Sequence, residues 1–122
     1  MNKKHTPLDA MEYPRFEGLR TFMRLPHTTN LDNVDFLVAG IPFDTGATFR
    51  VGARFGPSGI RENSLLLRPY NPAQDIEVFK YCSGIDYGDI PIVPGYLPES
   101  HKLIEKETAS LFQPNIVPIF MG

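Results

Sequence analysis

Cysteine is almost absent from the sequence, because the 122 residues contain only Cys82. One cysteine cannot form an intramolecular disulfide, nor can it complete the Cys-x-x-Cys pair of a redox or zinc site. We therefore expect Cys82 to belong to the core rather than to a reactive site. We also expect the chain to reside in a reducing, cytoplasmic setting.

Long apolar runs and runs of like charge are absent as well. No stretch approaches the roughly 20 apolar residues that span a bilayer, and residues 1–10 contain two lysines without the apolar segment of a secretory signal. The 12 basic and 14 acidic residues are mixed along the chain. These absences argue against a membrane or a nucleic acid as partner. The length, with 42% hydrophobic residues, predicts at most one globular domain.

The first part of the sequence, residues 1–33, differs from the remainder. It is rich in proline, threonine, asparagine and charge, and its apolar residues follow no sustained period. This composition predicts an extended N-terminal arm that needs another surface to lie on. One short helical turn is expected within it, at residues 16–23.

Apolar runs and helical patterns alternate through residues 34–122. The segment Asp35–Phe43 is nearly continuous in apolar residues, which is typical of a strand buried on both faces of a parallel sheet. A glycine-rich loop follows, and Pro57 suits the first turn of a helix that ends before Pro69. The expected elements are strand 35–43, helix 57–67, strand 81–85, helix 98–113 and strand 115–121.

The second predicted helix is amphipathic, with an apolar side formed by Leu103, Ile104, Leu111 and Phe112. Strands separated by helices of this length predict an α/β fold with a parallel sheet and right-handed crossovers. In such sheets ligands bind beyond the carboxyl ends of the strands, and the third predicted strand reaches this edge at Gly122.

Candidate metal ligands are few. The histidines at positions 5, 27 and 101 are widely separated, and we do not expect any of them to bind a metal. Asp86 and Asp89 lie at the end of the second predicted strand, close enough in sequence to share a cation or to act as acid and base. Alternatively, each carboxylate accepts hydrogen bonds from backbone N–H groups in a tight turn at Gly88, and we favour this structural role.

The glycine-rich loop of residues 44–57 is the most informative stretch. Arg50 and Arg54 offer planar guanidinium groups to carboxylates. The loop lacks the Lys-Ser/Thr ending of a P-loop and the Gly-x-Gly-x-x-Gly spacing of a dinucleotide fold. A glycine-rich loop before a helix can still bind an anion. In the alternative, structural role, the arginines pair with nearby carboxylates: Arg50, Arg54 and Arg61 with Asp44 and Glu62.

Several short motifs run through the chain: Gly40-Ile-Pro-Phe-Asp44, Thr48-x-Arg50-x-Gly52-Ala-Arg54-Phe-Gly-Pro57, Ile60-Arg61, Leu67-Arg-Pro-Tyr-Asn-Pro72 and Asp86-x-Gly-Asp89. Together they resemble the ureohydrolase family of arginases and agmatinases. In the arm, Pro14-Arg-Phe and Met23-Arg-Leu-Pro26 resemble the N-termini of guanidinobutyrases and guanidinopropionases. The resemblance covers nearly all of the chain, although no motif separates agmatine from other guanidino compounds as substrate.

The resemblance implies the N-terminal part of a three-layer α/β/α fold that is incomplete in this chain. It also implies an enzyme that hydrolyses a guanidino compound, of agmatine or guanidinobutyrate type, to an amine and urea. Two manganese ions would activate the attacking water, and the subunits would form homo-oligomers. The implied substrate-binding residues are Asp44, Thr48 and Arg50, near the mouth of the site.

The family's first metal ligand directly follows the third strand, which this chain reaches at Gly122. We therefore expect the isolated chain to bind no manganese pair and to be inactive. As part of a larger sheet, it is also expected to be marginally stable or to aggregate unless another chain completes it.

Two further functions stay open. One is a non-enzymatic interaction subunit that docks on a full-length ureohydrolase through the arm and the open edge of the sheet. The other is a small anion-binding α/β domain that uses the loop of Arg50 and Arg54.

Overall fold

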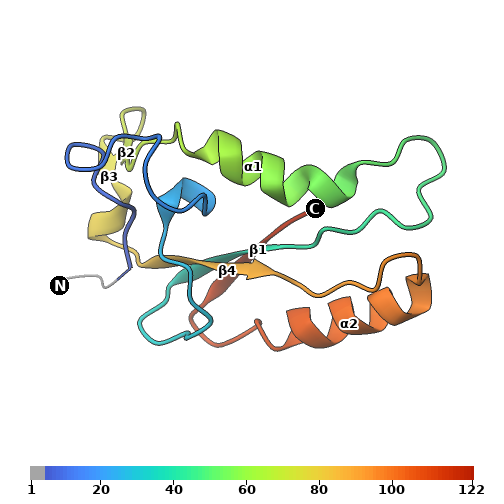
Figure 1. The fold of residues 1–122 in the computed structure, drawn as a ribbon. Helices are drawn as coiled ribbons and strands as arrows, with labels where there is room; N and C mark the ends of the chain where they lie inside the picture. Colours follow the sequence, from blue (N-terminus) through green and yellow to red (C-terminus); the bar gives the residue numbers. More distant parts are fainter. Residues whose placement is uncertain (1–4) are drawn as a thin grey trace.

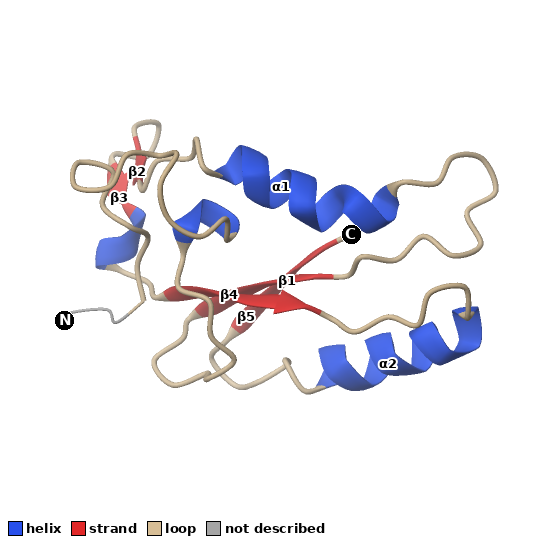
Figure 2. Ribbon diagram, in the orientation of Figure 1, coloured by secondary structure: helices blue, strands red, loops and turns tan. Residues whose placement is uncertain are grey.

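The computed structural model describes residues 5–122, and the first four residues of the expected arm lie outside this range. A parallel sheet with strand order β4-β1-β5 forms the middle layer. One helix covers each face of the sheet, as Figures 1 and 2 show, which confirms the predicted three-layer α/β arrangement. The main elements are β1 (Phe36–Gly40), α1 (Gly56–Ser64), β4 (Gly84–Asp89), α2 (Leu97–Ala109) and β5 (Val117–Met121).

The boundaries differ from the prediction mainly around β4. This strand begins at Gly84, where a side chain would collide with the ring of Phe36, and it ends at Asp89 rather than Ile85. A 3-10 turn at residues 78–80 lies just before the predicted start of the strand. The sequence also gave no sign of a small antiparallel hairpin, β2 (Tyr70–Asn71) and β3 (Ile76–Glu77).

The main core lies between the sheet and α2. Its fully buried side chains come from β1, β4 and the turn after α2, and they include Leu37, Ile85 and Leu111. Phe112 was expected on the same side but is 65% exposed, because α2 ends at Ala109 and the chain turns away from the helical direction. None of the helices between residues 5 and 122 has the length and apolar character of a membrane span.

The N-terminal arm covers the outer edge of β4. The backbone N–H of Asp86 donates to the carbonyl of Pro26, and that of Thr28 donates to the carbonyl of Asp86. At the start of β4, the N–H of Gly84 donates to the carbonyl of His5. The helical turn expected at residues 16–23 is a single 3-10 turn, η1 (Phe22–Arg24), which packs against α1.

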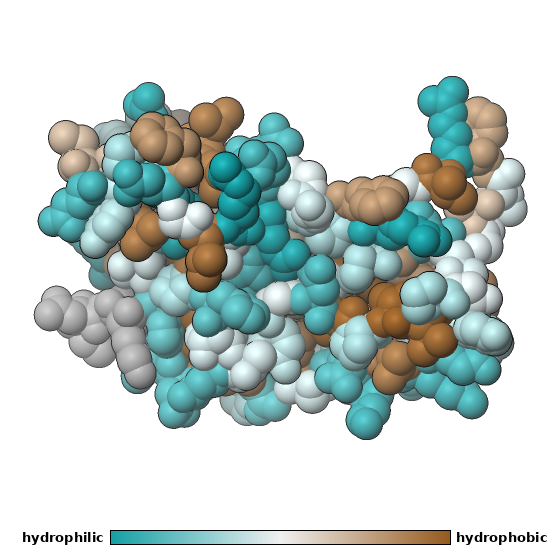
Figure 3. All heavy atoms as spheres, in the orientation of Figure 1, coloured by the Kyte–Doolittle hydropathy of each residue, from teal (hydrophilic) through white to brown (hydrophobic). Residues whose placement is uncertain are grey.

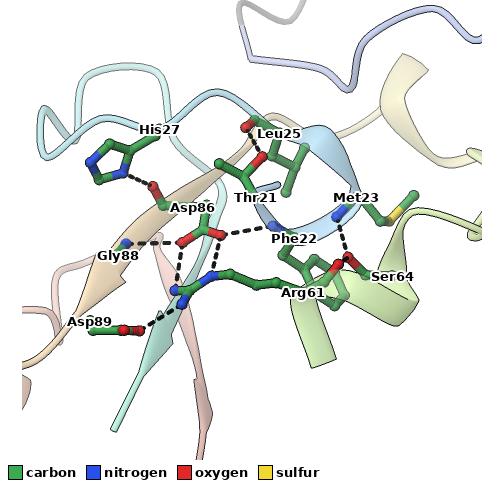
Figure 4. A network of polar contacts seen from close by, with 10 residues as sticks. All are labelled: Thr21, Phe22, Met23, Leu25, His27, Arg61, Ser64, Asp86, Gly88 and Asp89. Atoms are coloured by element: carbon green, nitrogen blue, oxygen red, sulfur yellow. Dashed lines mark hydrogen bonds and ion pairs between the residues drawn. The ribbon is translucent and has the colours of Figure 1, made fainter. Parts of the chain in front are cut away.

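A buried ion pair ties the arm, α1 and β4 together (Figure 4). From α1, Arg61 donates through Nε and Nη2 to the two carboxylate oxygens of Asp86, at 2.8 and 3.0 Å, and through Nη1 to Asp89 at 2.7 Å. Asp86 also accepts the N–H groups of Phe22 and Gly88, at 2.8 and 2.9 Å. The alternative pairing of Arg61 with Glu62 or Asp44 is therefore wrong.

These contacts control the charge of Asp86. Burial raises its pKa, but the guanidinium of Arg61 and the N–H groups of Phe22 and Gly88 outweigh burial and hold the pKa below its ordinary value. The side chain is 1% exposed. The favoured structural role is thus confirmed for Asp86, with Arg61 as an additional partner, and Asp89 serves as a second acceptor for the same arginine.

Replacing Asp86 by asparagine removes the buried charge partner of Arg61 and leaves only the more exposed carboxylate of Asp89. We expect the free energy of unfolding to fall by about 3–5 kcal/mol. Because the folded-state pKa of Asp86 is depressed, its carboxylate stabilises the fold above about pH 4 and loses this contribution as the pH falls through the folded-state value. Melting temperatures of the natural chain and Asp86→Asn, measured from about pH 7 to about pH 2, should therefore converge toward the acid end of this range.

Glu62→Gln is the matched control for this prediction. Glu62 and Arg20 form an ion pair at 3.3 Å whose side chains are 61% and 51% exposed, so we expect its loss to change stability by less than about 1 kcal/mol. Equal effects of the two substitutions, or an Asp86→Asn difference that persists in acid, would contradict the role assigned to the buried pair.

A side chain at Gly40 would separate β1 from its neighbours. A Cβ atom there would overlap the carboxylate of Asp89 and lie 2.8 Å from the Cβ of Pro57 in α1. We expect Gly40→Ala to destabilise the chain by about 1–3 kcal/mol. Gly59→Ala is the control, since its Cβ would meet no atom within 4 Å. Denaturant unfolding should separate the two variants, and equal stability would contradict this close packing.

Candidate functional site

The carboxyl ends of the strands meet at one edge of the sheet, where the loop between β1 and α1 begins. The N–H of Ile41 donates to the carbonyl of Met121 at 2.7 Å, and the N–H of Ile90 donates to that of Gly40 at 2.8 Å. A Cβ atom on Gly56 would lie 3.0 Å from the carbonyl of Gly122, so the start of α1 borders the end of β5. This is the edge at which α/β sheets bind their ligands.

Asp44 holds the base of the loop together. One carboxylate oxygen accepts the N–H groups of Gly52 and Arg54, at 2.8 and 3.2 Å. The other receives Nε and Nη2 of Arg54, each at 2.8 Å. The structural pairing of Arg54 with Asp44 is thus confirmed. The N–H of Gly52 holds the pKa of this carboxyl below its ordinary value, against the effect of burial and with help from Arg54.

Gly52 is required for this closure. Its φ of 138° lies in the region that favours glycine, and this backbone conformation precedes the turn that brings the N–H of Arg54 to Asp44. A loop closed in this way has a fixed base.

The tip of the loop is exposed. Thr48 and Arg50 lie there, and the guanidinium carbon of Arg50 is 5.1 Å from the ring centroid of Phe49, which is itself 87% exposed. In Figure 3 the loop stands out from the body of the molecule at the upper right, with hydrophilic and hydrophobic side chains next to each other. Of the three predicted substrate-binding residues, Asp44 therefore belongs to the base and the other two to the tip.

A cleft of about 310 Å³ lies beside the base of this loop. Asp44 and Arg54 form its polar part, while Phe43, Ile92 and Pro94 form an apolar wall. Ile92 and Pro94 were not among the predicted site residues. Their only signal in the sequence is that they follow the second strand, at the edge where parallel strands place their ligands.

The residues described here do not fit a manganese pair. Between residues 5 and 122, no three His, Cys, Asp or Glu side chains come close enough to hold a metal ion. Asp86 and Asp89 bind Arg61 instead. Nδ1 of His27 lies 2.9 Å from the carbonyl oxygen of Asp86, and the ring of His101 packs against Phe43.

Comparisons with known proteins agree with the motifs. The arginase family model matches residues 34–122. Guanidinobutyrase of Pseudomonas aeruginosa is 40% identical over 97% of this chain and 38% of its own length. Guanidinopropionase of the same organism is 36% identical over 99% of this chain and 38% of its own length.

Solved structures show the same likeness. A hypothetical agmatinase from Burkholderia thailandensis superposes with a TM-score of 0.79 and 33% identity, over 87% of this chain and 34% of that one. Proclavaminate amidino hydrolase from Streptomyces clavuligerus superposes with a TM-score of 0.74 and 34% identity, over 80% of this chain and 33% of that one. The chain spans about a third of the length of these relatives, from 33% to 38%. On the fold, the loop motif and these matches, the chain belongs to the arginase family.

Proposed function

We propose that the chain is the N-terminal part of a hydrolase that cleaves a guanidino compound, of guanidinobutyrate or agmatine type, to an amine and urea. The observation that carries this proposal is the 40% identity with a guanidinobutyrase across almost the whole chain. In the complete enzyme, a pair of manganese ions would supply the activated water, held by residues beyond those described here.

The role of this chain is to build the rim of the site. The fixed base at Asp44 holds the loop against the start of α1, so that Thr48 and Arg50 extend from a defined position. An exposed guanidinium suits the carboxylate of a guanidino acid, because it can form two parallel charge-assisted hydrogen bonds. Arg50 and Thr48 would therefore orient the end of the substrate that does not react.

A fusion protein tests this function directly. In guanidinobutyrase of Pseudomonas aeruginosa, the segment that matches this chain is replaced by the whole chain of 122 residues. We expect the fusion to release urea from guanidinobutyrate when it is loaded with manganese. A folded, manganese-loaded fusion that releases no urea would contradict the proposal.

Within the active fusion, Arg50→Ala should raise KM for guanidinobutyrate at least about tenfold, since a hydrogen bond to a charged group contributes roughly 1.5–3 kcal/mol. Steady-state kinetics measure the effect. Arg68→Ala is the control, because Arg68 is also exposed but lies past the other end of α1. An unchanged KM in Arg50→Ala would contradict the proposed contact with the substrate.

The isolated chain is expected to release no urea from guanidinobutyrate or agmatine with manganese present, because its described residues offer no set of metal ligands. A urea assay, with the fusion as the positive control, measures this. Urea release that persists in repeated preparations of the chain alone would show that its own residues suffice for the reaction.

A further inference from the structure

A cavity of about 420 Å³ lies between the N-terminal arm and the segment that follows α1. Most of its lining comes from the arm, and the remainder comes from residues between 65 and 79. The loop of the candidate functional site precedes α1, so this cavity lies at the opposite end of the helix (Figure 1). A cavity of this size with apolar walls and a few polar groups is typical of a small-molecule site.

Arg24 is the buried charged residue of this cavity, with 6% of its surface exposed. Its Nη1 donates to the backbone carbonyls of Tyr13, Pro14 and Glu17, at 2.8, 2.9 and 3.3 Å. None of its partners among residues 5–122 is a carboxylate. A guanidinium that is removed from water is costly unless an anion compensates its charge. Arg24 therefore carries a positive charge that the described part of the chain does not neutralise.

The other nitrogens of Arg24 are available to a ligand. Within residues 5–122, every side-chain nitrogen that is sealed from solvent has a hydrogen-bond partner. Nε and Nη2 of Arg24 have no partner in that range, so both are reached by solvent, and Arg24 lines the cavity. Nε and Nη2 are adjacent donors that can bind both oxygens of one carboxylate. Arg61 uses this same pair on Asp86.

The backbone at this position is also unusual. Met23 and Arg24 both line the cavity, and their φ angles of 51° and 55° lie in the left-handed region. Residues other than glycine adopt this conformation only where surrounding contacts fix it, and such residues are frequent at ligand sites. The arm thus holds Arg24 in a defined position at the cavity.

Arg15 supplies a second guanidinium. Its Nη1 donates to the carbonyls of Leu65 and Leu67, both at 2.9 Å, which fixes the side chain between the arm and the segment after α1. Like Arg24, Arg15 has no carboxylate partner among residues 5–122 and lines the cavity. The two arginines therefore favour an anionic ligand.

The remaining lining limits the charge and shape of that ligand. Asp9 and Glu77 also line the cavity without forming an ion pair to either arginine, so they reduce its positive potential and disfavour a multiply charged anion. The walls are otherwise mainly apolar and include Leu8, Met23, Leu65, Leu67 and Phe79. A singly charged carboxylate with a short apolar body matches both properties.

We infer that this cavity binds a small monocarboxylate, whose two oxygens receive Nε and Nη2 of Arg24 and whose apolar part lies against Leu8 and Phe79. This inference goes beyond the proposed function, because the cavity is separate from the loop that carries Thr48 and Arg50. Because the ligand would contact both the arm and the segment after α1, its binding would hold the two together.

The first test compares three ligands by calorimetric titration of the natural chain and of the fusion with guanidinobutyrase. Butyrate is the probe, 1-butanol has the same length without the charge, and inorganic phosphate has charge without an apolar part. We expect butyrate to bind at least about tenfold more tightly than the other two, since it alone combines a charge-assisted pair of hydrogen bonds with apolar contacts. Equal affinity for butyrate and either comparison ligand, or no saturable binding of butyrate, would overturn the inference.

The place of binding is tested by the backbone amide resonances of the natural chain. Saturation with butyrate should shift the resonances of Leu8, Arg24 and Phe79. Shifts confined to residues 44–57 would assign the carboxylate to the candidate functional site and overturn the inference.

A matched pair of substitutions tests the role of Arg24. Arg24→Lys keeps the positive charge but removes the paired donors, so we expect the Kd for butyrate to rise at least about tenfold. Arg20→Lys is the control, because Arg20 also belongs to the arm but is 51% exposed and bound to Glu62. An unchanged Kd in a folded Arg24→Lys would overturn the inference. The comparison of ligands on the natural chain decides the matter if this variant does not fold.

Discussion

The ion pair between Arg61 and Asp86 is the contact on which the remaining arrangement depends. It joins α1 to β4, and the same carboxylate receives the N–H of Phe22 from the arm. A buried charge without its partner is strongly destabilising, so these three segments adopt their places together. Once α1 is held over the sheet, Pro57 packs on Gly40, and both ends of the intervening loop are fixed.

That loop meets two requirements of a binding rim in different places: its base is fixed, and its tip is exposed. Its base is closed by Asp44, which uses both carboxylate oxygens on Gly52 and Arg54. Its tip carries Thr48 and Arg50 in solvent and contributes nothing to the core. Side chains at the tip can therefore be exchanged among related proteins without loosening the sheet, which is how loops on a rigid scaffold acquire different specificities.

Local signals in the sequence predict the parts of this molecule that local contacts form. The apolar run predicts β1, and the pairing of Asp44 with Arg54, ten positions apart, is one of the alternatives that the sequence offers. The sequence predicts a turn for most of β4, because Asp86 and its neighbours interrupt the apolar pattern. A buried aspartate in a strand is acceptable only with Arg61, 25 positions away. The apolar wall of the cleft depends in the same way on strand order, which the sequence does not specify.

Proline at position 118 has a consequence for aggregation. An unpaired strand edge is a template on which identical chains can stack in fibrils, each copy extending the last. The outer edge of β5 pairs with no other strand among residues 5–122, and Pro118 faces it, because Val117 and Met121 bond toward β1. Pro118 has no N–H, so every added copy would lack one hydrogen bond in the stack. Pro118 therefore weakens fibril growth along this edge of β5.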